Sequence, residues 1–332
     1  MQRYRSAAAA TRRQFLGWSA AAGLGITALT ACQSSQTQPS EQTAATRTVT
    51  GFGGPTEVPA TPGRVIASES ITLGHLLALG VKPAAAAVNV NSLPTYQAEL
   101  VGGVPDVTAG DGMDLEKALS IDPDLIITVV GSRDEPTWNE KSYDQYKAAL
   151  TTFGYTSGYA TIEEIEEGFT SVAAAMGLQD KAQQVTDAYD QRVAGLAERI
   201  KNAGLGSKPV TTLRLSQDFY SLRIGTSESI AFRALGMTQP AGQREVADFS
   251  IEISLERLDI LDEADTLFVY ADDNAEKDRQ TWESSKIWQS VEAVRQKRVH
   301  WVNSGIWNSQ DLVGLMRILD DIERTFVVPN GG

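Results

Sequence analysis

The chain has 332 residues, of which 42% are hydrophobic, and it carries a formal net charge of −13. This length is enough for two globular domains, and the negative charge argues against a general binder of phosphate backbones or nucleic acid. The two histidines, His75 and His300, and the single cysteine cannot form an intrachain disulfide or a Cys/His metal cage.

Residues 1–31 have the composition of an export signal. They contain four arginines and no acidic residue, and they include a Gly/Ala-rich apolar run from residue 15 to residue 29. This run is too short and too weakly apolar for a stable membrane span. The Arg12-Arg13 pair, with Phe15 shortly after it, resembles a twin-arginine export signal.

The single cysteine, Cys32, follows Leu29-Thr30-Ala31, which resembles a bacterial lipobox. The alternative is a chance arginine pair with a stray buried cysteine, but the cysteine stands where cleavage should occur. We therefore expect Cys32 to carry lipid and to hold the protein at the extracytoplasmic face of the cell membrane. Residues 32–50 are rich in Gln, Ser and Thr without apolar periodicity, which predicts a flexible tether after the cysteine.

Residues 51–178 alternate strand and helix patterns, which indicates an α/β lobe. The apolar run at 124–130 is typical of a parallel strand that is covered on both faces. The expected strands are 65–67, 84–88, 124–130 and 155–159, and the expected helices are 70–79, 115–120, 143–153 and 162–176.

Residues 179–204 predict one long linker helix. Val185, Tyr189, Val193, Leu196 and Ile200 recur at steps of three or four and form one apolar stripe. Asp180 is the expected cap at the start, and Gly204 is the expected stop. At ~1.5 Å per residue this helix is roughly 36 Å long, which suits either a large single core or a bridge between two domains. The chain on either side favours the bridge.

Residues 205–332 repeat the pattern of the first lobe. The expected strands are 210–215, 220–224, 266–270 and 299–302, and the expected helices are 227–235, 255–261, 287–294 and 310–326. Leu115-Glu116-Lys117 in the first lobe corresponds to Leu255-Glu256-Arg257 in the second, and the two glutamates are 140 residues apart. This repeat predicts two related α/β lobes with mostly parallel central sheets flanked by helices, joined by the long helix.

The order of these motifs resembles the substrate-binding proteins of bacterial ABC importers for ferric siderophores and cobalamin. The resemblance covers the body of the chain through short motifs in one order: Pro59-x-x-Pro62-x-Arg64-Val65, Leu79-Gly80-Val81, Leu115-Glu116, Ile121-Asp122-Pro123-Asp124, Leu235-Gly236, Leu255-Glu256 and Gly305-Ile306-Trp307. It implies a monomer with two lobes joined by a rigid helix and a ligand held in the cleft between them.

The resemblance also implies a partner for the repeated glutamates. In the family, one exposed carboxylate on each lobe docks to arginines of the importer permease, and the matching positions are Glu116 and Glu256. The alternative is that both glutamates only favour the first turn of their own helices. The chain shows no G-x-S-x-G elbow, P-loop or HExxH motif, so we expect a binding protein and not an enzyme.

The ligand implied by the resemblance is an iron(III)–siderophore chelate, which needs broad apolar walls and a few fixed donors. In the second lobe the candidate ligand-binding residues are Arg214, Tyr220, Arg223 and Trp307. The alternative role of Arg214 is an ion pair with Asp218, and the alternative role of Trp307 is packing against the last helix. In the first lobe, loops after the expected strands supply Glu69, Asn91, Arg133 and Trp138.

Few cations among aromatic side chains suit a hydroxamate or mixed chelate better than a trianionic catecholate. Cobalamin and haem stay open as alternative ligands because the same architecture serves all three. Direct zinc or manganese binding is disfavoured by the two scattered histidines. The remote alternative is a structural surface lipoprotein without a ligand. No cofactor of the protein itself is expected.

Overall fold

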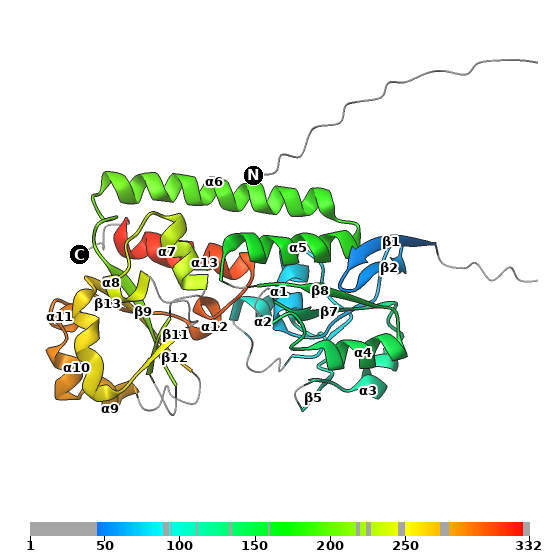
Figure 1. The fold of residues 1–332 in the computed structure, drawn as a ribbon, viewed down its shortest axis with the longest axis horizontal. Coiled ribbons are helices and arrows are strands. Elements are labelled where there is room, and N and C mark those ends of the chain that lie inside the picture. The colour runs from blue at the N-terminus through cyan, green and yellow to red at the C-terminus, as the bar shows by residue number, and fades with distance from the viewer. Residues whose placement is uncertain are drawn as a thin grey trace, which may run out of the picture. The chain divides into compact units, whose positions relative to one another are not determined.

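The structure, a computed structural model, describes residues 45–88, 93, 95–110, 112–132, 135–158, 160–216, 220–223, 227–244, 250–272 and 279–327. Within these residues the chain forms a short N-terminal hairpin, two α/β lobes and the long helix α6 (Gln179–Asn202), which runs along one side of both lobes (Figure 1). The expected signal peptide, Cys32 and most of the expected tether lie outside the described residues.

The hairpin consists of β1 (Thr46–Gly51) and β2 (Gly54–Pro59), which pair in antiparallel register. Residues 46–50, expected in the tether, therefore belong to the folded body. Arg47 holds the hairpin in place by donating to the carbonyl oxygens of Ala174 and Ala175, each at 2.5 Å. These carbonyls close the last turn of α5 (Ile162–Met176), where a helix lacks internal donors. This long-range contact leaves no local pattern in the sequence.

The N-terminal lobe is built on a four-stranded parallel sheet of order β4-β3-β7-β8. Every position of β7 is buried, as expected for a central parallel strand. Besides α5, the elements of this lobe are β3 (Val65–Ala67), α1 (Ser70–Ala78), β4 (Ala85–Ala86), α2 (Thr95–Val101), β5 (Thr108–Ala109), β6 (Gly112–Met113), α3 (Leu115–Leu119), β7 (Leu125–Gly131), α4 (Glu140–Ala149) and β8 (Thr152–Thr156).

Strand β8 begins three residues earlier than its expected range of 155–159, and α4 ends before residue 153. Gly154, which directly follows the expected helix 143–153, lies inside the strand and is closely approached by its neighbours. A Cβ atom there would lie 2.6 Å from the Tyr143 ring and 2.8 Å from Val130. The glycine is therefore explained by packing between α4 and the sheet.

Helix α6 carries the predicted apolar stripe, and Tyr189, Leu196 and Ile200 on it are buried. The helix starts directly after Gly177, whose φ of 72° ends α5, so Leu178 and not Asp180 is the N-cap residue. Gly204 ends α6 with a φ of 68°, as predicted.

The C-terminal lobe contains a five-stranded sheet of order β11-β10-β9-β12-β13. Strands β9, β12 and β13 are parallel, and β10 is the antiparallel partner of β9, as expected for residues 220–224. The elements are β9 (Val210–Leu215), β10 (Tyr220–Arg223), α7 (Ser227–Ala234), α8 (Ala241–Arg244), β11 (Ser250–Ile253), the 3-10 helix η2 (Leu255–Glu263), β12 (Thr266–Ala271), α9 (Arg279–Glu283), α10 (Lys286–Ser290), α11 (Glu292–Arg295), β13 (Val299–Trp301), α12 (Ser304–Trp307) and α13 (Leu312–Phe326).

The helix expected at 287–294 is divided into α10 and α11 at Val291, which has an extended backbone. The second piece starts with a cap from another part of the chain, because the Glu292 amide donates to Asp262 Oδ1 at 2.8 Å. Asp262 belongs to η2, so the break depends on tertiary packing.

The two lobes share one apolar core in addition to the linking helix. A single cluster of buried side chains includes Leu73 of α1, Phe169 of α5, Tyr189 of α6, Phe268 of β12 and Leu315 of α13. Arg192 of α6 also donates to Asp320 of α13 at 3.0 Å. Helix α13 thus packs against elements of both lobes (Figure 1).

Candidate functional site

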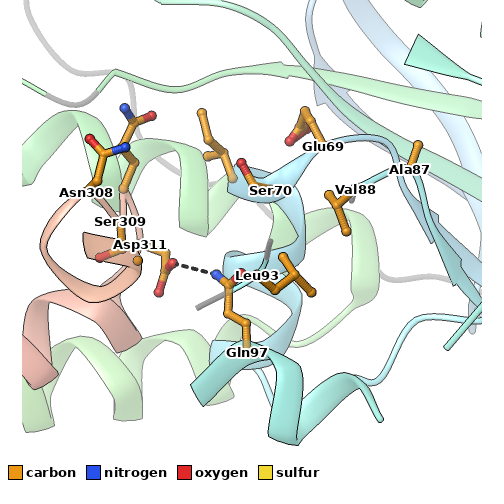
Figure 2. Close-up of a pocket in the computed structure, with 12 residues that line it drawn as sticks. Glu69, Ser70, Ala87, Val88, Leu93, Gln97, Asn308, Ser309 and Asp311 are labelled. Carbon is orange, nitrogen blue, oxygen red and sulfur yellow. Dashed lines mark hydrogen bonds between the residues drawn. The ribbon is translucent and has the colours of Figure 1, made fainter. Parts of the chain in front are cut away.

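A cavity of about 490 Å³ lies where the two lobes meet (Figure 2). This volume falls within the usual range for small-molecule sites, and the position at the carboxyl ends of β3 and β4 is where α/β proteins bind ligands. The N-terminal lobe contributes Glu69, Ser70, Ile71, Ala87, Val88, Leu93 and Gln97, and α12 with the loop that follows it contributes Gly305, Asn308, Ser309, Gln310 and Asp311.

Glu69, one of the predicted site residues, forms part of the cavity wall and is the N-cap of α1. Its Oε2 atom accepts the Thr72 amide at 2.9 Å, and its Oε1 atom accepts the Val129 amide at 3.0 Å. The Thr72 hydroxyl also donates to Oε1. Burial raises the pKa of the Glu69 carboxyl, although these hydrogen bonds oppose the change.

Asp311, which the sequence analysis did not select, links the two lobes at the base of the cavity. It is the N-cap of α13, and its Oδ1 atom accepts the Gly314 amide at 2.9 Å. Its Oδ2 atom accepts the Tyr96 hydroxyl at 3.0 Å and the Gln97 amide group at 3.2 Å, both from α2. Asp311 is 1% exposed, and burial raises its pKa.

The close approach at Asp311 requires a glycine on the facing helix. A Cβ atom on Gly74 of α1 would lie 2.5 Å from Asp311 Oδ2. An aspartate before an apolar run is a recognisable N-cap signal, so Asp311 was available to sequence reasoning as the start of the last helix. Its contacts with Tyr96 and Gln97 had no such signal, because they join segments more than 200 residues apart.

Arg214 stands at the end of β9 in a two-bond ion pair with Asp272. Its Nε and Nη2 atoms donate to Oδ1 and Oδ2, each at 2.9 Å. Burial lowers the pKa of Arg214, but the hydrogen bond and charge of Asp272 outweigh it, so the pKa is raised. The alternative partner considered from the sequence, Asp218, lies outside the described residues. Two donors of the guanidinium are thus already engaged by the protein.

Arg223 is the predicted site residue of the C-terminal lobe that comes nearest to the cavity wall. It is 3% exposed, and its Nη2 atom donates at 3.2 Å to Oδ1 of Asn308, which lines the cavity. Tyr220, at the start of β10, is half-buried and stacks on Trp282 with ring centroids 5.7 Å apart. Neither Arg214 nor Tyr220 belongs to the cavity lining.

Trp307 lies in the core and not on a ligand-facing wall. It is 0% exposed, stacks on Phe268 with centroids 4.6 Å apart, and donates from Nε1 to Asp321 of α13 at 2.7 Å. These contacts match the alternative in which Trp307 packs against the last helix, and they leave no face for a ligand. Trp138 is 51% exposed and lies outside the cavity lining. Asn91 and Arg133 lie outside the described residues.

The repeated glutamates are both exposed in the first turns of their helices. Glu116 lies in α3 beside its N-cap Asp114, and Glu256 lies in η2 after Ser254. Hydrogen bonds from its own backbone amide and from Ser254 lower the pKa of Glu256. Both side chains are thus accessible to a partner.

The described residues contain no group of three or more His, Cys, Asp or Glu side chains that could hold a metal ion. None of the helices in the described ranges has both the length and the apolar character needed to cross a membrane. The residues that line the cavity offer both hydrogen-bonding groups and apolar contacts.

Two α/β lobes joined by a long helix, with a cavity between them, define a two-lobed binding protein. The sequence model of the family described as periplasmic binding protein matches residues 65–303. The chain belongs to this family.

Relatives of known assignment match nearly the whole chain. The probable siderophore-binding lipoprotein YfiY of Bacillus subtilis (strain 168) is 28% identical over 323 residues, which cover 92% of this chain and 95% of YfiY. The iron(3+)-hydroxamate-binding protein FhuD of the same organism is 28% identical over 286 residues, covering 83% of this chain and 86% of FhuD. Among solved structures, Staphylococcus aureus SirA complexed with staphyloferrin B matches with a TM-score of 0.69 and 22% identity, covering 84% of this chain and 98% of SirA. The structural likeness establishes the shared fold.

Proposed function

We propose that this protein captures an iron(III)–siderophore chelate between its lobes and delivers it to the permease of an ABC importer. The observation that carries the proposal is the inter-lobe cavity, in a family member whose matched relatives YfiY and FhuD are named as siderophore- and hydroxamate-binding proteins.

The residues proposed to contact the chelate are the candidates from the sequence, with one exception. Glu69 lines the cavity, and Arg223 supports its wall through Asn308. Arg214, Tyr220 and Trp138, which are not among the described lining residues, stay in the proposal, and so do Asn91 and Arg133, which lie outside the described residues. Trp307 is omitted because it is buried in the core. A hydroxamate or mixed chelate remains the preferred ligand class.

Calorimetric titration of the purified protein against a panel tests the ligand. The panel contains ferric hydroxamate, catecholate and citrate chelates, cobalamin and haem. We expect a ferric hydroxamate or mixed chelate to bind most tightly. If cobalamin or haem binds more tightly, that molecule is the ligand and the chelate is not. Absence of binding across the panel would support a structural lipoprotein instead.

A pair of arginine variants tests the cleft assignment. Arg214→Gln should weaken chelate binding, since a planar guanidinium can donate to hydroxamate or carboxylate oxygens. Arg257→Gln is the matched control, because Arg257 is exposed and paired with Asp259 at 3.4 Å on η2. Equal affinity of both variants would remove Arg214 from the site.

Delivery to the permease is proposed to use Glu116 and Glu256. Charge reversal at both positions should abolish iron uptake by cells while leaving chelate binding in solution unchanged. Reversal of a third exposed glutamate, Glu140 of α4, provides the control for a change in surface charge. Loss of chelate affinity in the double variant would contradict the docking role.

The anchoring of the protein is proposed from its first thirty-two residues. Cys32→Ala should release the protein from the membrane fraction, and Arg12→Lys with Arg13→Lys should block export through the twin-arginine route. Retention of the Cys32→Ala protein on the membrane would argue against a lipid anchor. We also propose a monomer in solution, which light scattering of the purified protein tests.

A further inference from the structure

We propose that the inter-lobe cavity binds a protonated amine on an arm of the chelate, through Glu69 and Gln97. This inference rests on the proposed function, and it adds the chemistry by which the site selects among chelates. An iron chelate presents its periphery to the protein, so a charged arm is a natural point of discrimination.

The wall of the cavity contains carboxylates but no cationic side chain among the described residues. Its charged members are Glu69 and Asp311. The surrounding sequence is also free of cations, because residues 83–97 and 302–310 contain no charged residue. An anionic arm would meet two buried carboxylates here and would lose its water without gaining a counter-charge. The wall therefore favours a neutral or positively charged group.

Gln97 presents a buried acceptor at this wall. The residue is 2% exposed, and its Nε2 atom donates to Asp311 Oδ2 and to the Tyr96 hydroxyl, each at 3.2 Å. The amide nitrogen of Gln97 points to Asp311 (Figure 2). Oε1 is buried and has no hydrogen-bond partner within the described part of the chain. A buried acceptor without a donor is unfavourable, so a ligand N–H group would complete it.

Glu69 supplies the counter-charge across the same cavity. Its Oε1 atom is occupied by the Val129 amide and the Thr72 hydroxyl, whereas Oε2 accepts the Thr72 amide at 2.9 Å. A carboxylate oxygen has room for a second donor. The half-buried side chain of Glu69 lines the cavity, while Asp311 is almost completely buried. Glu69 is thus the carboxylate that a ligand can reach.

The arginines of the C-terminal lobe do not offset the negative charge of the cavity wall. Arg223 approaches the cavity from behind Asn308, and Arg214 is paired with Asp272. Glu228 accepts the Tyr270 hydroxyl at 3.0 Å in the same region, and its charge acts on Arg214. Arg214 is therefore matched by Asp272, and Glu228 adds a second carboxylate to the same region of the C-terminal lobe.

An ammonium group fits this arrangement because it carries three N–H donors and a positive charge. Its donors can bond to Glu69 Oε2 or complete Gln97 Oε1. Hydrogen bonds between ionised partners are about twice as strong as neutral ones. Acetylation of the amine keeps one N–H donor but removes the charge, and succinylation replaces the positive charge by a negative one. These derivatives separate charge recognition from general affinity for the chelate.

The test uses three forms of one linear ferric trihydroxamate: with a terminal primary amine, with the amine acetylated and with it succinylated. Calorimetric titration of the full-length protein should show the amine form binding at least about tenfold more tightly than the acetylated form, and the succinylated form binding most weakly. In the Glu69→Gln variant the amine form should no longer bind more tightly than the acetylated form. The affinity of the variant for the acetylated form should stay within about twofold of that of the unaltered protein.

Two further variants make the result specific. Gln97→Met keeps the side-chain length but removes the acceptor, and it should also reduce the preference for the amine. It provides the same test if Glu69→Gln does not fold. Glu140→Gln makes the same chemical change as Glu69→Gln at an exposed position of α4, and it should leave all three affinities unchanged.

Equal binding of the three chelates by the unaltered protein, or tighter binding of the succinylated form, would overturn the inference and leave the proposed function in place. An amine preference that persists in both Glu69→Gln and Gln97→Met would also overturn it. If the protein binds none of the three forms and no other ferric chelate, the proposed function itself fails.

Discussion

His75 makes the stability of the protein sensitive to acid. Its side chain is 0% exposed in α1 and lies between the rings of Tyr155 and Phe169, with centroid distances of 6.0 and 5.8 Å. Neither ring nitrogen has a hydrogen-bond partner among the described residues. Burial disfavours the charged imidazolium and lowers the pKa of His75 from 6.5 to about 3.

The sign of the effect follows from where the proton binds first. Because the pKa of His75 is lower in the folded protein, the unfolded chain takes up the proton earlier as the pH falls below 6.5. The free energy of unfolding therefore decreases between pH 6.5 and about 3. Between pH 7 and pH 5 the shift corresponds to a loss of about 2 kcal/mol, a large fraction of a typical total of roughly 5–15 kcal/mol.

Replacing His75 by Phe tests this reasoning, because phenylalanine keeps an aromatic ring in the same place and cannot be protonated. Urea unfolding at pH 7, 6 and 5, followed by circular dichroism, gives the free energy of unfolding of both proteins. We expect the unaltered protein to lose about 2 kcal/mol more than His75→Phe between pH 7 and pH 5. Glu69, Asp311 and His300 titrate in both proteins, so their contributions cancel in the difference. The same pH dependence in both proteins would refute the assignment.

Three further predictions follow from the packing. Trp307→Ala should lower the free energy of unfolding by about 3–5 kcal/mol in urea unfolding, since it empties a fully buried site. Unchanged stability together with lost chelate affinity would instead place Trp307 in the cleft. Tyr96→Phe should cost about 1–3 kcal/mol in the same assay, because Asp311 loses a buried donor, and an unaffected midpoint would contradict this. Small-angle scattering should show only slight compaction on chelate binding, because α13 and the shared core hold both lobes together. A large decrease in the radius of gyration would contradict this limited movement of the lobes.

Helix α1 contains both the residue that is proposed to recognise a chelate arm and the residue that makes the stability of the protein sensitive to acid. Glu69 caps the start of α1 and faces the cavity, whereas His75 lies further along the same helix and faces α5. Gly74, between them, permits the contact with Asp311. Helix α1 therefore takes part in the cavity wall, the first-lobe core and the contact with the start of α13.

Local patterns were sufficient for the elements whose ends and faces are determined by neighbouring residues. The apolar stripe of α6 places Tyr189 and Leu196 on one buried face, and Gly204 ends the helix because it adopts a positive φ readily. The fully apolar run of β7 likewise requires cover on both faces. Periodicity and helix-end chemistry act within a few residues, so they can be recognised in a sequence alone.

The spacing and order of the motifs also predicted the arrangement of whole lobes, because the repeated Leu-Glu pairs indicated two lobes around a linker. They located Glu116 and Glu256 on exposed first turns, which the structure contains as α3 and η2. Glu69 was placed at the end of the first strand, and it does line the cavity. Parallel strands bring their carboxyl ends to one edge of a sheet, so residues after these strands are reasonable candidates for a site.

The tertiary structure alone decided which candidate side chains face the cavity. Trp307 turns into the core because Phe268 and Asp321, distant in sequence, provide a stacking surface and an acceptor. Arg214 is engaged by Asp272 from a neighbouring strand. The meeting of Gln97 and Asp311 depends on how the lobes pack. The sequence by itself predicted the long helix, the central parallel strands and the two-lobed organisation, because these follow from patterns within short segments and from their repetition. The site depends on contacts between distant segments, which only the folded chain brings together.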